Sequence, residues 1–296
     1  IVAAAGLGGA FLGSRFGGEG RIVKPFTAEP SHRVRVDAKV VVLAAGCMAT
    51  PVLLQKSDDL ANGSRQVGEN LQFHPGVALM GVFPERTQPQ FGATQGYQSL
   101  HFVRRGFKLE TLWAPPGVLA VRLPGFGFDL KQNLARFPYS AIWDAIGSCN
   151  RSLGRVKARR GTLDPALTYA LHPEDVKILG EAMWVLAQIF FAAGAISVLP
   201  GVHRLPDEMF SLAEAEVLRT HDLKASDLTC GGNHVCSTTR MHGDPRQGVV
   251  DEMGRCHDMD NLYVVDTGIL PRSPSVNPML TAMALAHRSA GEITAR

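Results

Sequence analysis

Three residues near the end of the 296-residue chain have side chains that could take part in chemistry. His234 follows two glycines, and a neutral histidine can take up a proton because its pKa lies near physiological pH. Asp266 ends a short, continuous apolar run at 262–265 that predicts a buried parallel strand, and ligands bind at the carboxyl ends of such strands. Asn277 precedes Pro278, a pair that predicts a capped helix start whose positive end stabilises negative charge. The three residues therefore predict a ligand site.

Cysteine and histidine residues of the same region could alternatively bind a metal ion. The candidates are Cys230, His234, Cys236, Cys256 and His257. Their spacing lacks the closely spaced cysteine pairs that are typical of structural zinc sites, so we expect no metal. Five cysteines, an odd number with irregular spacing, do not predict a disulfide framework either, which favours a reducing, cytoplasmic compartment.

The first 13 residues are small and apolar, and they fit two interpretations. As a signal peptide they lack a preceding basic stretch and a following small-residue cleavage site, so we expect none. As a dinucleotide-binding loop, their nearest fit places Ala4, Gly6 and Gly9 at the three glycine positions, but no acidic residue follows at the expected distance. We therefore expect an incomplete phosphate loop at most, and a nucleotide-binding domain whose first part is missing.

The remaining elements can be predicted from apolar periodicity and from proline and glycine. Residues 40–46 form a second buried strand that ends in Gly46, and a helix follows through Leu54. Residues 76–223 alternate apolar stretches with proline-containing loops, which predicts an antiparallel sheet. Residues 173–194 predict the clearest helix, apolar on one face, and Glu181 argues against a transmembrane span there.

Composition narrows the classes of partner. The chain is 45% hydrophobic and 19% charged, which is ordinary for a globular protein of one large or two smaller domains. The net charge of +3 is too small to favour nucleic acid as a partner, and the basic run at 151–160 is typical of a surface loop. The sequence gives no prediction of the oligomeric state.

Several motifs in fixed order identify a family. They are H-x-x-G-T-x-x-M at 234–241, V-V-D at 249–251, N-L-Y-V-x-D at 261–266, V-N-P-x-L-T at 276–281, a strand ending in A-A-G at 40–46, and G-x-N-L-x-x-H-P at 68–75. In this order they resemble the C-terminal portion of the glucose-methanol-choline (GMC) family of FAD-dependent oxidoreductases. Two residues depart from the family pattern, since Ser237 and His242 stand where the family usually has glycine.

The resemblance implies an α/β chain of two domains. A Rossmann-like FAD-binding layer, incomplete at its N-terminus, would comprise residues 1–75 and 226–296, with the catalytic motifs in the second range. Residues 76–225 would form the antiparallel-sheet substrate domain. An alternative is that the chain is a non-catalytic fragment of such an enzyme.

The resemblance also implies roles for named residues. His234 would remove the hydroxyl proton of an alcohol while hydride passes to FAD, giving an aldehyde or ketone, and Asn277 would orient the hydroxyl. The residues implied in cofactor binding are Ala45, Gly46, Asp266, Thr267, Pro278 and Met279. We expect FAD to be bound non-covalently, because the histidine of the family's usual attachment region is not in the sequence.

The substrate is predicted only as a class. The middle region is rich in large apolar residues, and these indicate either core or a site for a long-chain or sterol-like alcohol. They are Phe102, Phe107, Leu112, Trp113, Val118, Leu119, Phe126, Phe128, Phe190 and Phe191. The electron acceptor would be oxygen or another molecule, and the sequence does not separate an oxidase from a dehydrogenase.

Overall fold

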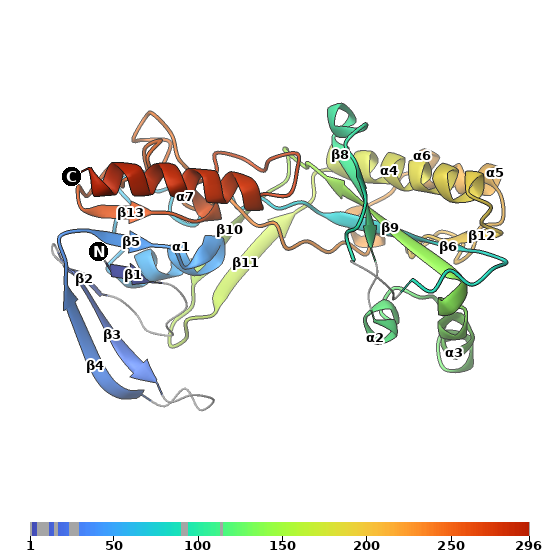
Figure 1. Cartoon of the computed structure of the whole chain (residues 1–296), viewed down its shortest axis with the longest axis horizontal. Helices are drawn as coiled ribbons and strands as arrows, with labels where there is room; N and C mark the ends of the chain where they lie inside the picture. The colour runs from blue at the N-terminus through green and yellow to red at the C-terminus, as the bar shows by residue number, and fades with distance from the viewer. Residues whose placement is uncertain are drawn as a thin grey trace. The chain divides into compact units, whose positions relative to one another are not determined.

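A computed structural model of the chain (Figure 1) describes residues 2–4, 12–14, 17–23, 30–89, 94–112 and 115–295. The chain divides into two compact units. Unit 1 consists of Ile1–Phe73, Ser152–Ala170 and His234–Arg296. Unit 2 consists of His74–Arg151 and Leu171–Asn233. We describe each unit by itself.

Unit 1 contains a parallel sheet whose strands lead to residues of the predicted ligand site. Its strand order is β1 (Val2–Ala4), β5 (Val41–Leu43) and β13 (Leu262–Val264), and both neighbouring pairs are parallel. Helix α1 (Gly46–Lys56) follows β5, and helix α7 (Met279–Thr294) ends the chain. Leu43, Val264 and other buried residues form the core between these elements. The predicted strands at 40–46 and 262–265 are confirmed, while positions 6 and 9 of the expected phosphate loop lie outside the described residues.

Two antiparallel elements complete unit 1. Strands β2 (Leu12–Ser14), β3 (Gly17–Val23) and β4 (Pro30–Asp37) form one sheet. Strands β10 (Leu153–Ala158) and β11 (Pro165–Ala170) form a hairpin. The Gln55 side chain of α1 donates to the Val156 carbonyl (3.0 Å) and accepts from the Ala158 amide (2.6 Å), which holds the hairpin against α1. This hairpin falls within the expected substrate domain, 76–225, but in the structure it belongs to unit 1.

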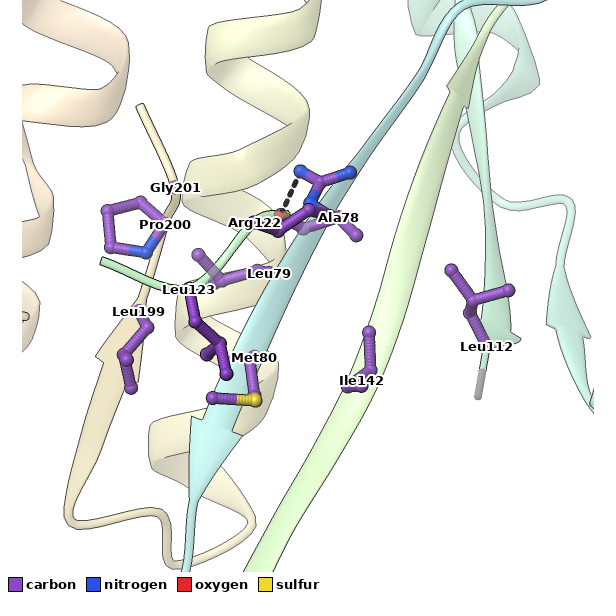
Figure 2. A pocket seen from close by; sticks show the side chains of 10 residues that line it. All are labelled: Ala78, Leu79, Met80, Leu112, Arg122, Leu123, Ile142, Leu199, Pro200 and Gly201. Atoms are coloured by element: carbon purple, nitrogen blue, oxygen red, sulfur yellow. Dashed lines mark hydrogen bonds between the residues drawn. The ribbon is translucent and has the colours of Figure 1, made fainter. Parts of the chain in front are cut away.

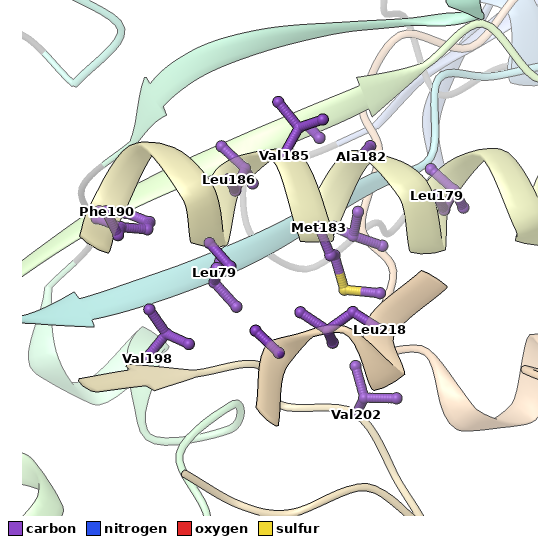
Figure 3. Packing of buried hydrophobic residues seen from close by; sticks show 14 of the residues in the cluster. Leu79, Leu179, Ala182, Met183, Val185, Leu186, Phe190, Val198, Val202 and Leu218 are labelled. Atoms are coloured by element: carbon purple, nitrogen blue, oxygen red, sulfur yellow. The ribbon is translucent and has the colours of Figure 1, made fainter. Parts of the chain in front are cut away.

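Unit 2 is built on a five-stranded antiparallel sheet. Its order is β12 (Ser197–Leu199), β6 (Gly76–Val82), β9 (Ser140–Gly147), β8 (Phe107–Leu112) and β7 (Gln98–Ser99). Helix α4 (Pro173–Ala192) covers one face, and its apolar side packs on the odd-numbered residues of β6 and β8 (Figure 3). The predicted helix at 173–194 and the predicted mixed α/β fold with an antiparallel sheet are confirmed.

Short helices fill the connections of both units. They are η1 (Val103–Arg105), α2 (Pro116–Leu119), α3 (Phe128–Ala135), η2 (Phe137–Tyr139), α5 (Leu212–Ala215), α6 (Val217–Thr220), η3 (Ala225–Asp227) and η4 (Thr267–Ile269). Within the described ranges, no helix combines the length and the apolar character needed to cross a membrane.

The large apolar residues of the middle region separate into core, pocket and surface. Phe107 and Phe190 are buried in the core against α4. Leu112 instead lines a pocket on the other face of the sheet, whereas Phe126 and Phe128 are 92% and 69% exposed. Trp113 lies outside the described residues, and so do the side chains of Val118 and Leu119.

Candidate active site

Asp266 connects the carboxyl ends of two neighbouring parallel strands. It follows β13, and its carboxylate faces the start of α1, which follows β5. Oδ2 accepts hydrogen bonds from the Gly46 amide (3.0 Å) and the Thr50 hydroxyl (2.6 Å), and Oδ1 accepts one from the Gly268 amide (2.7 Å). Burial raises the pKa of Asp266, and the bonds from Thr50, Gly268 and Gly46 act in the opposite direction. Both carboxylate oxygens are thus occupied by protein donors.

The turn from β5 into α1 depends on glycine. Gly46 has φ +87°, in the left-handed region that favours glycine, and this conformation directs its amide toward Asp266. The preceding Ala45 amide donates to the Thr50 hydroxyl (3.2 Å). Thr50 therefore accepts from one end of the turn and donates to the carboxylate, so it fixes both. Sequence reasoning missed Thr50, although it lies in the conspicuous Thr50-Pro51 pair.

The histidine motif lies alongside the loop that follows Asp266. Three amides of the motif donate to that loop: Ser237 to the Thr267 carbonyl (3.3 Å), Thr239 to Gly268 (3.0 Å) and Met241 to Ile269 (2.8 Å). The hydroxyl of Thr238 donates to the carbonyl of Cys47 in α1 (2.5 Å). The motif is therefore held against the ends of both parallel strands.

Ser237 has an unfavourable backbone conformation at the position where the resembling family usually has glycine. Its φ is +77°, and its side chain is buried. Only glycine adopts this region without a steric cost from Cβ. The Ser237 hydroxyl donates to the Cys236 sulfur (3.3 Å), a weak bond that offsets little of this cost.

Gln72 holds together the two segments that carry the catalytic candidates. Its backbone exchanges hydrogen bonds with Cys236 (3.1 and 2.9 Å), two residues after His234, which is half-buried. Its side-chain oxygen accepts from the Ser273 amide (2.8 Å), at the start of the segment leading to Asn277. Sequence reasoning missed Gln72 because it occupies a variable position of the G-x-N-L-x-x-H-P motif.

Asn277 does not cap α7, contrary to the prediction. Pro278 immediately precedes the helix with helical dihedrals (φ −82°, ψ −5°), and no side chain caps this end. The helical start therefore lies one residue later than expected, and the Asn277 side chain does not reach the helix amides. Its Oδ1 is buried and has no hydrogen-bond partner among the described residues. An unsatisfied buried acceptor is costly, so this oxygen indicates a place where a ligand donor could bind.

Four of the five cysteines are buried, and Cys230 is partly buried. All five are free, and burial raises the pKa of Cys47 to about 12 and that of Cys236 to about 11. In the part of the chain that the structure describes, no group of three or more histidine, cysteine, aspartate or glutamate side chains could hold a metal ion.

Comparison with known proteins identifies the family. Two family models described as GMC oxidoreductase match residues 22–76 and 150–286. The chain belongs to the GMC oxidoreductase family. The resemblance drawn from the motifs is confirmed, and the matched ranges include the Ala45-Gly46 turn, the histidine motif, Asp266 and Asn277.

The chain matches part of the length of its GMC relatives. It is 33% identical to an uncharacterized GMC-type oxidoreductase of Mycobacterium tuberculosis, over 88% of this chain and 40% of that protein. It is 27% identical to a long-chain-alcohol oxidase of Arabidopsis thaliana, over 88% of this chain and 36% of that protein. A formate oxidase variant from Aspergillus oryzae, solved to study FAD modification, matches with a TM-score of 0.67 at 16% identity, over 98% of this chain and 60% of that one. That structural likeness supports the fold.

Proposed function

We propose that this GMC chain provides the catalytic residues of an FAD-dependent enzyme that oxidises an alcohol to an aldehyde or ketone. The single observation that carries the proposal is the buried, unpartnered Oδ1 of Asn277. Gln72 bonds to Cys236, two residues after His234, and to Ser273, four residues before Asn277, which supports the proposal that the two act together. Because the chain spans less than half the length of the two curated relatives above, the activity proposed is that of the whole protein.

The residues at the strand ends fit a phosphate-bearing, partly anionic cofactor. Bound FAD would supply a hydride acceptor. The residues proposed to hold it are Ala45, Gly46, Asp266, Thr267, Pro278 and Met279. The Gly46 backbone has open space on its Cβ side, which allows close approach of a cofactor, although its amide already donates to Asp266. The first amides of α7 have no side-chain cap, so backbone donors are available at that helix start. Asp266, whose oxygens already accept three protein donors, would act by fixing the loops that carry Gly46 and Thr267.

The two catalytic candidates would divide the work on the substrate hydroxyl. The His234 imidazole accepts the hydroxyl proton as general base, because a neutral imidazole is basic near pH 7. The Asn277 carboxamide holds the same hydroxyl and orients its carbon–hydrogen bond toward the acceptor. The partial positive charge at the start of α7 stabilises the negative charge that develops near it.

We infer an apolar alcohol as the substrate class. Unit 2 has a small pocket, partly open to solvent, whose lining is mostly aliphatic (Figure 2). The relative named as a long-chain-alcohol oxidase agrees with such a substrate. In an alcohol panel with oxygen and with an artificial acceptor, a long-chain or sterol-like alcohol should give a higher kcat/KM than glucose or choline. A higher kcat/KM on glucose or choline would contradict this substrate class.

Substitution at the two candidates tests the reaction. In the full-length, flavin-containing protein, His234→Ala should lower kcat and kcat/KM together by about 10²–10⁴-fold, the usual effect of losing a general base. His242→Ala is a matched control, because His242 is exposed in the neighbouring turn. Unchanged turnover in both His234→Ala and Asn277→Ala would place the active site elsewhere. Absence of flavin absorbance from the full-length protein would favour the non-catalytic alternative.

Asn277 allows catalysis and stability to be separated. Because its Oδ1 makes no bond within the described structure, Asn277→Ala should leave the melting temperature unchanged or slightly higher while turnover falls. A drop in stability of about 1 kcal/mol would instead indicate that Asn277 caps α7 in solution.

A further inference from the structure

The segment that carries Asn277 has few backbone donors of its own. Residues 271–277, all within the described part of the chain, belong to no helix or strand. Pro271, Pro274 and the following Pro278 have no amide hydrogen to donate. The Asn277 side-chain oxygen does not hold the segment either, since it has no hydrogen-bond partner among the described residues. The place of Asn277 therefore depends on contacts made elsewhere along the segment.

Ser273 anchors this segment to the buried interior of unit 1. Its amide donates to the side-chain oxygen of Gln72 (2.8 Å), and Gln72 and Ser273 are both buried. The Ser273 side chain also hydrogen-bonds to the thiol of Cys236, which is fully buried. Because water does not reach these groups, loss of the Gln72 oxygen would leave the Ser273 amide without a replacement acceptor.

The segment that carries His234 is held in a different way. The backbone of Gln72 exchanges two hydrogen bonds with the backbone of Cys236 (3.1 and 2.9 Å), and any residue except proline at position 72 could make both. Val235 packs against the apolar cluster that contains Leu71. The main chain of Gln72 thus fixes the segment of His234, whereas its side chain fixes the segment of Asn277.

We propose that Gln72 is a positioning residue of the alcohol oxidation, whose side chain sets the place of the Asn277 carboxamide relative to the His234 imidazole. This inference rests on the proposed function, in which both groups act on one substrate hydroxyl. Two such groups must keep their mutual geometry closely, because a small misplacement can lower the rate by about 10²-fold. In this role Gln72 acts through Asn277 and not on the substrate.

Gln72→Met tests this role in the full-length, flavin-containing protein. Methionine keeps the length of the side chain and the backbone pairing with Cys236, but it has no oxygen to accept the Ser273 amide. The values of kcat and kcat/KM for an alcohol should fall together by about 10–100-fold, with KM nearly unchanged, because orientation matters in the transition state. The flavin absorbance should stay as in the parent protein.

A double substitution separates positioning from a general loss of stability. In an Asn277→Ala background there is no carboxamide to position, so Gln72→Met should lower kcat no further. A merely structural effect would lower kcat by the same factor in both backgrounds. Gln55→Met is the matched control, because the Gln55 oxygen also accepts a distant amide, that of Ala158 (2.6 Å), but ties the β10–β11 hairpin to α1. It should lower the melting temperature and leave kcat unchanged.

Hydrogen exchange gives a readout that needs no turnover. In Gln72→Met, the Ser273 amide, followed in peptides covering 271–277, should exchange about 5- to 100-fold faster than in the parent. Peptides covering 234–241 should exchange at the parental rate, because the backbone bonds with Cys236 persist. Equal acceleration in both sets of peptides, or none in either, would contradict the separate roles of the main chain and side chain of Gln72.

The inference is overturned if Gln72→Met keeps the parental kcat, or if it lowers kcat equally with and without the Asn277 carboxamide. If Gln72→Met fails to fold, Gln72→Asn carries the same test, because its shorter side chain withdraws the oxygen from the Ser273 amide. Failure of the proposed function has a different signature. His234→Ala and Asn277→Ala would then turn over alcohol at the parental rate, while Ser273 exchange would still respond to Gln72→Met.

Discussion

Thr50→Val removes one hydroxyl and keeps the shape of the side chain, so it isolates the bonds that hold Asp266. The Thr50 hydroxyl donates to Asp266 (2.6 Å) and accepts from the Ala45 amide (3.2 Å), and Thr50 is fully buried. Loss of a bond to a charged group costs about 1.5–3 kcal/mol, and loss of a neutral bond about 1 kcal/mol. Since Asp266 is only half-buried as a residue, we expect the loss of both hydrogen bonds to lower the free energy of unfolding of this region by about 2–4 kcal/mol.

The assay must report on unit 1. Trp143 and Trp184 belong to unit 2, so their fluorescence follows the other unit. Hydrogen exchange of peptides covering 41–56, read by mass spectrometry, gives a local measure of opening. If local opening becomes easier by about 2–4 kcal/mol, the amides of these peptides should exchange about 30- to 1,000-fold faster in Thr50→Val than in the parent protein. The cost should shrink at acid pH, because the lost hydroxyl bond favours the ionised carboxylate, whose pKa burial already raises.

Thr239→Val is the matched control. Thr239 is also fully buried beside Gly268, but its hydroxyl oxygen has no hydrogen-bond partner among the described residues. Replacing that hydroxyl with a methyl group should therefore be neutral or slightly stabilising. The reasoning is refuted if the two variants exchange at the same rate, or if the effect of Thr50→Val grows as the pH is lowered.

Three further outcomes follow from other buried groups. Ser237→Gly should stabilise the protein by about 0.5–1 kcal/mol in urea unfolding. The left-handed backbone conformation costs a non-glycine residue about 1–2 kcal/mol, and the entropy that glycine loses on folding costs less than this. A lower urea midpoint in the variant would contradict the prediction. The pKa of Asp144 rises from 3.8 in the unfolded chain to about 7, so stability should fall as pH rises from about 4 through about 7, and the Asp144→Asn profile should be flatter. Cys47 and Cys236 should react with a thiol reagent at pH 8 much more slowly in native than in unfolded protein, because burial raises the pKa of each; equal rates would exclude this.

Local patterns predicted the elements that position the site. The apolar run before Asp266 is short and β-rich, which predicted a buried strand, and the strand at 40–46 ends in a glycine that the turn requires. The order of the motifs predicted the family, and the antiparallel sheet and α4 followed from alternation and helical periodicity. Each of these predictions depends on residues close together in the sequence.

Sequence reasoning missed hydrogen bonds between residues that are distant in the sequence, and its prediction of one helix cap was wrong. The bond between Thr50 and Asp266 joins residues 216 positions apart, and the one between Gln72 and Ser273 joins residues 201 apart. No periodicity signals such pairs. The Asn277 cap was predicted from residue preference, but Pro278 already has helical dihedrals and displaces the helix start by one residue. Assignment of FAD and substrate binding to the two units stays a prediction.

The motif residues of this chain fall into two kinds: those whose polar atoms are all hydrogen-bonded within the protein, and those with a buried polar atom that has no protein partner. Asp266 accepts three protein donors, so its position at a strand end is explained by the turns it fixes. Asn277, in contrast, has a buried oxygen that no described residue satisfies. An unsatisfied buried group lowers stability, and the Thr239 hydroxyl shows that such a group does not by itself indicate a ligand. Asn277 differs from Thr239 because a helix start with uncapped amides follows it directly. Asn277 is therefore the residue at which substitution should change ligand binding or turnover more than folding.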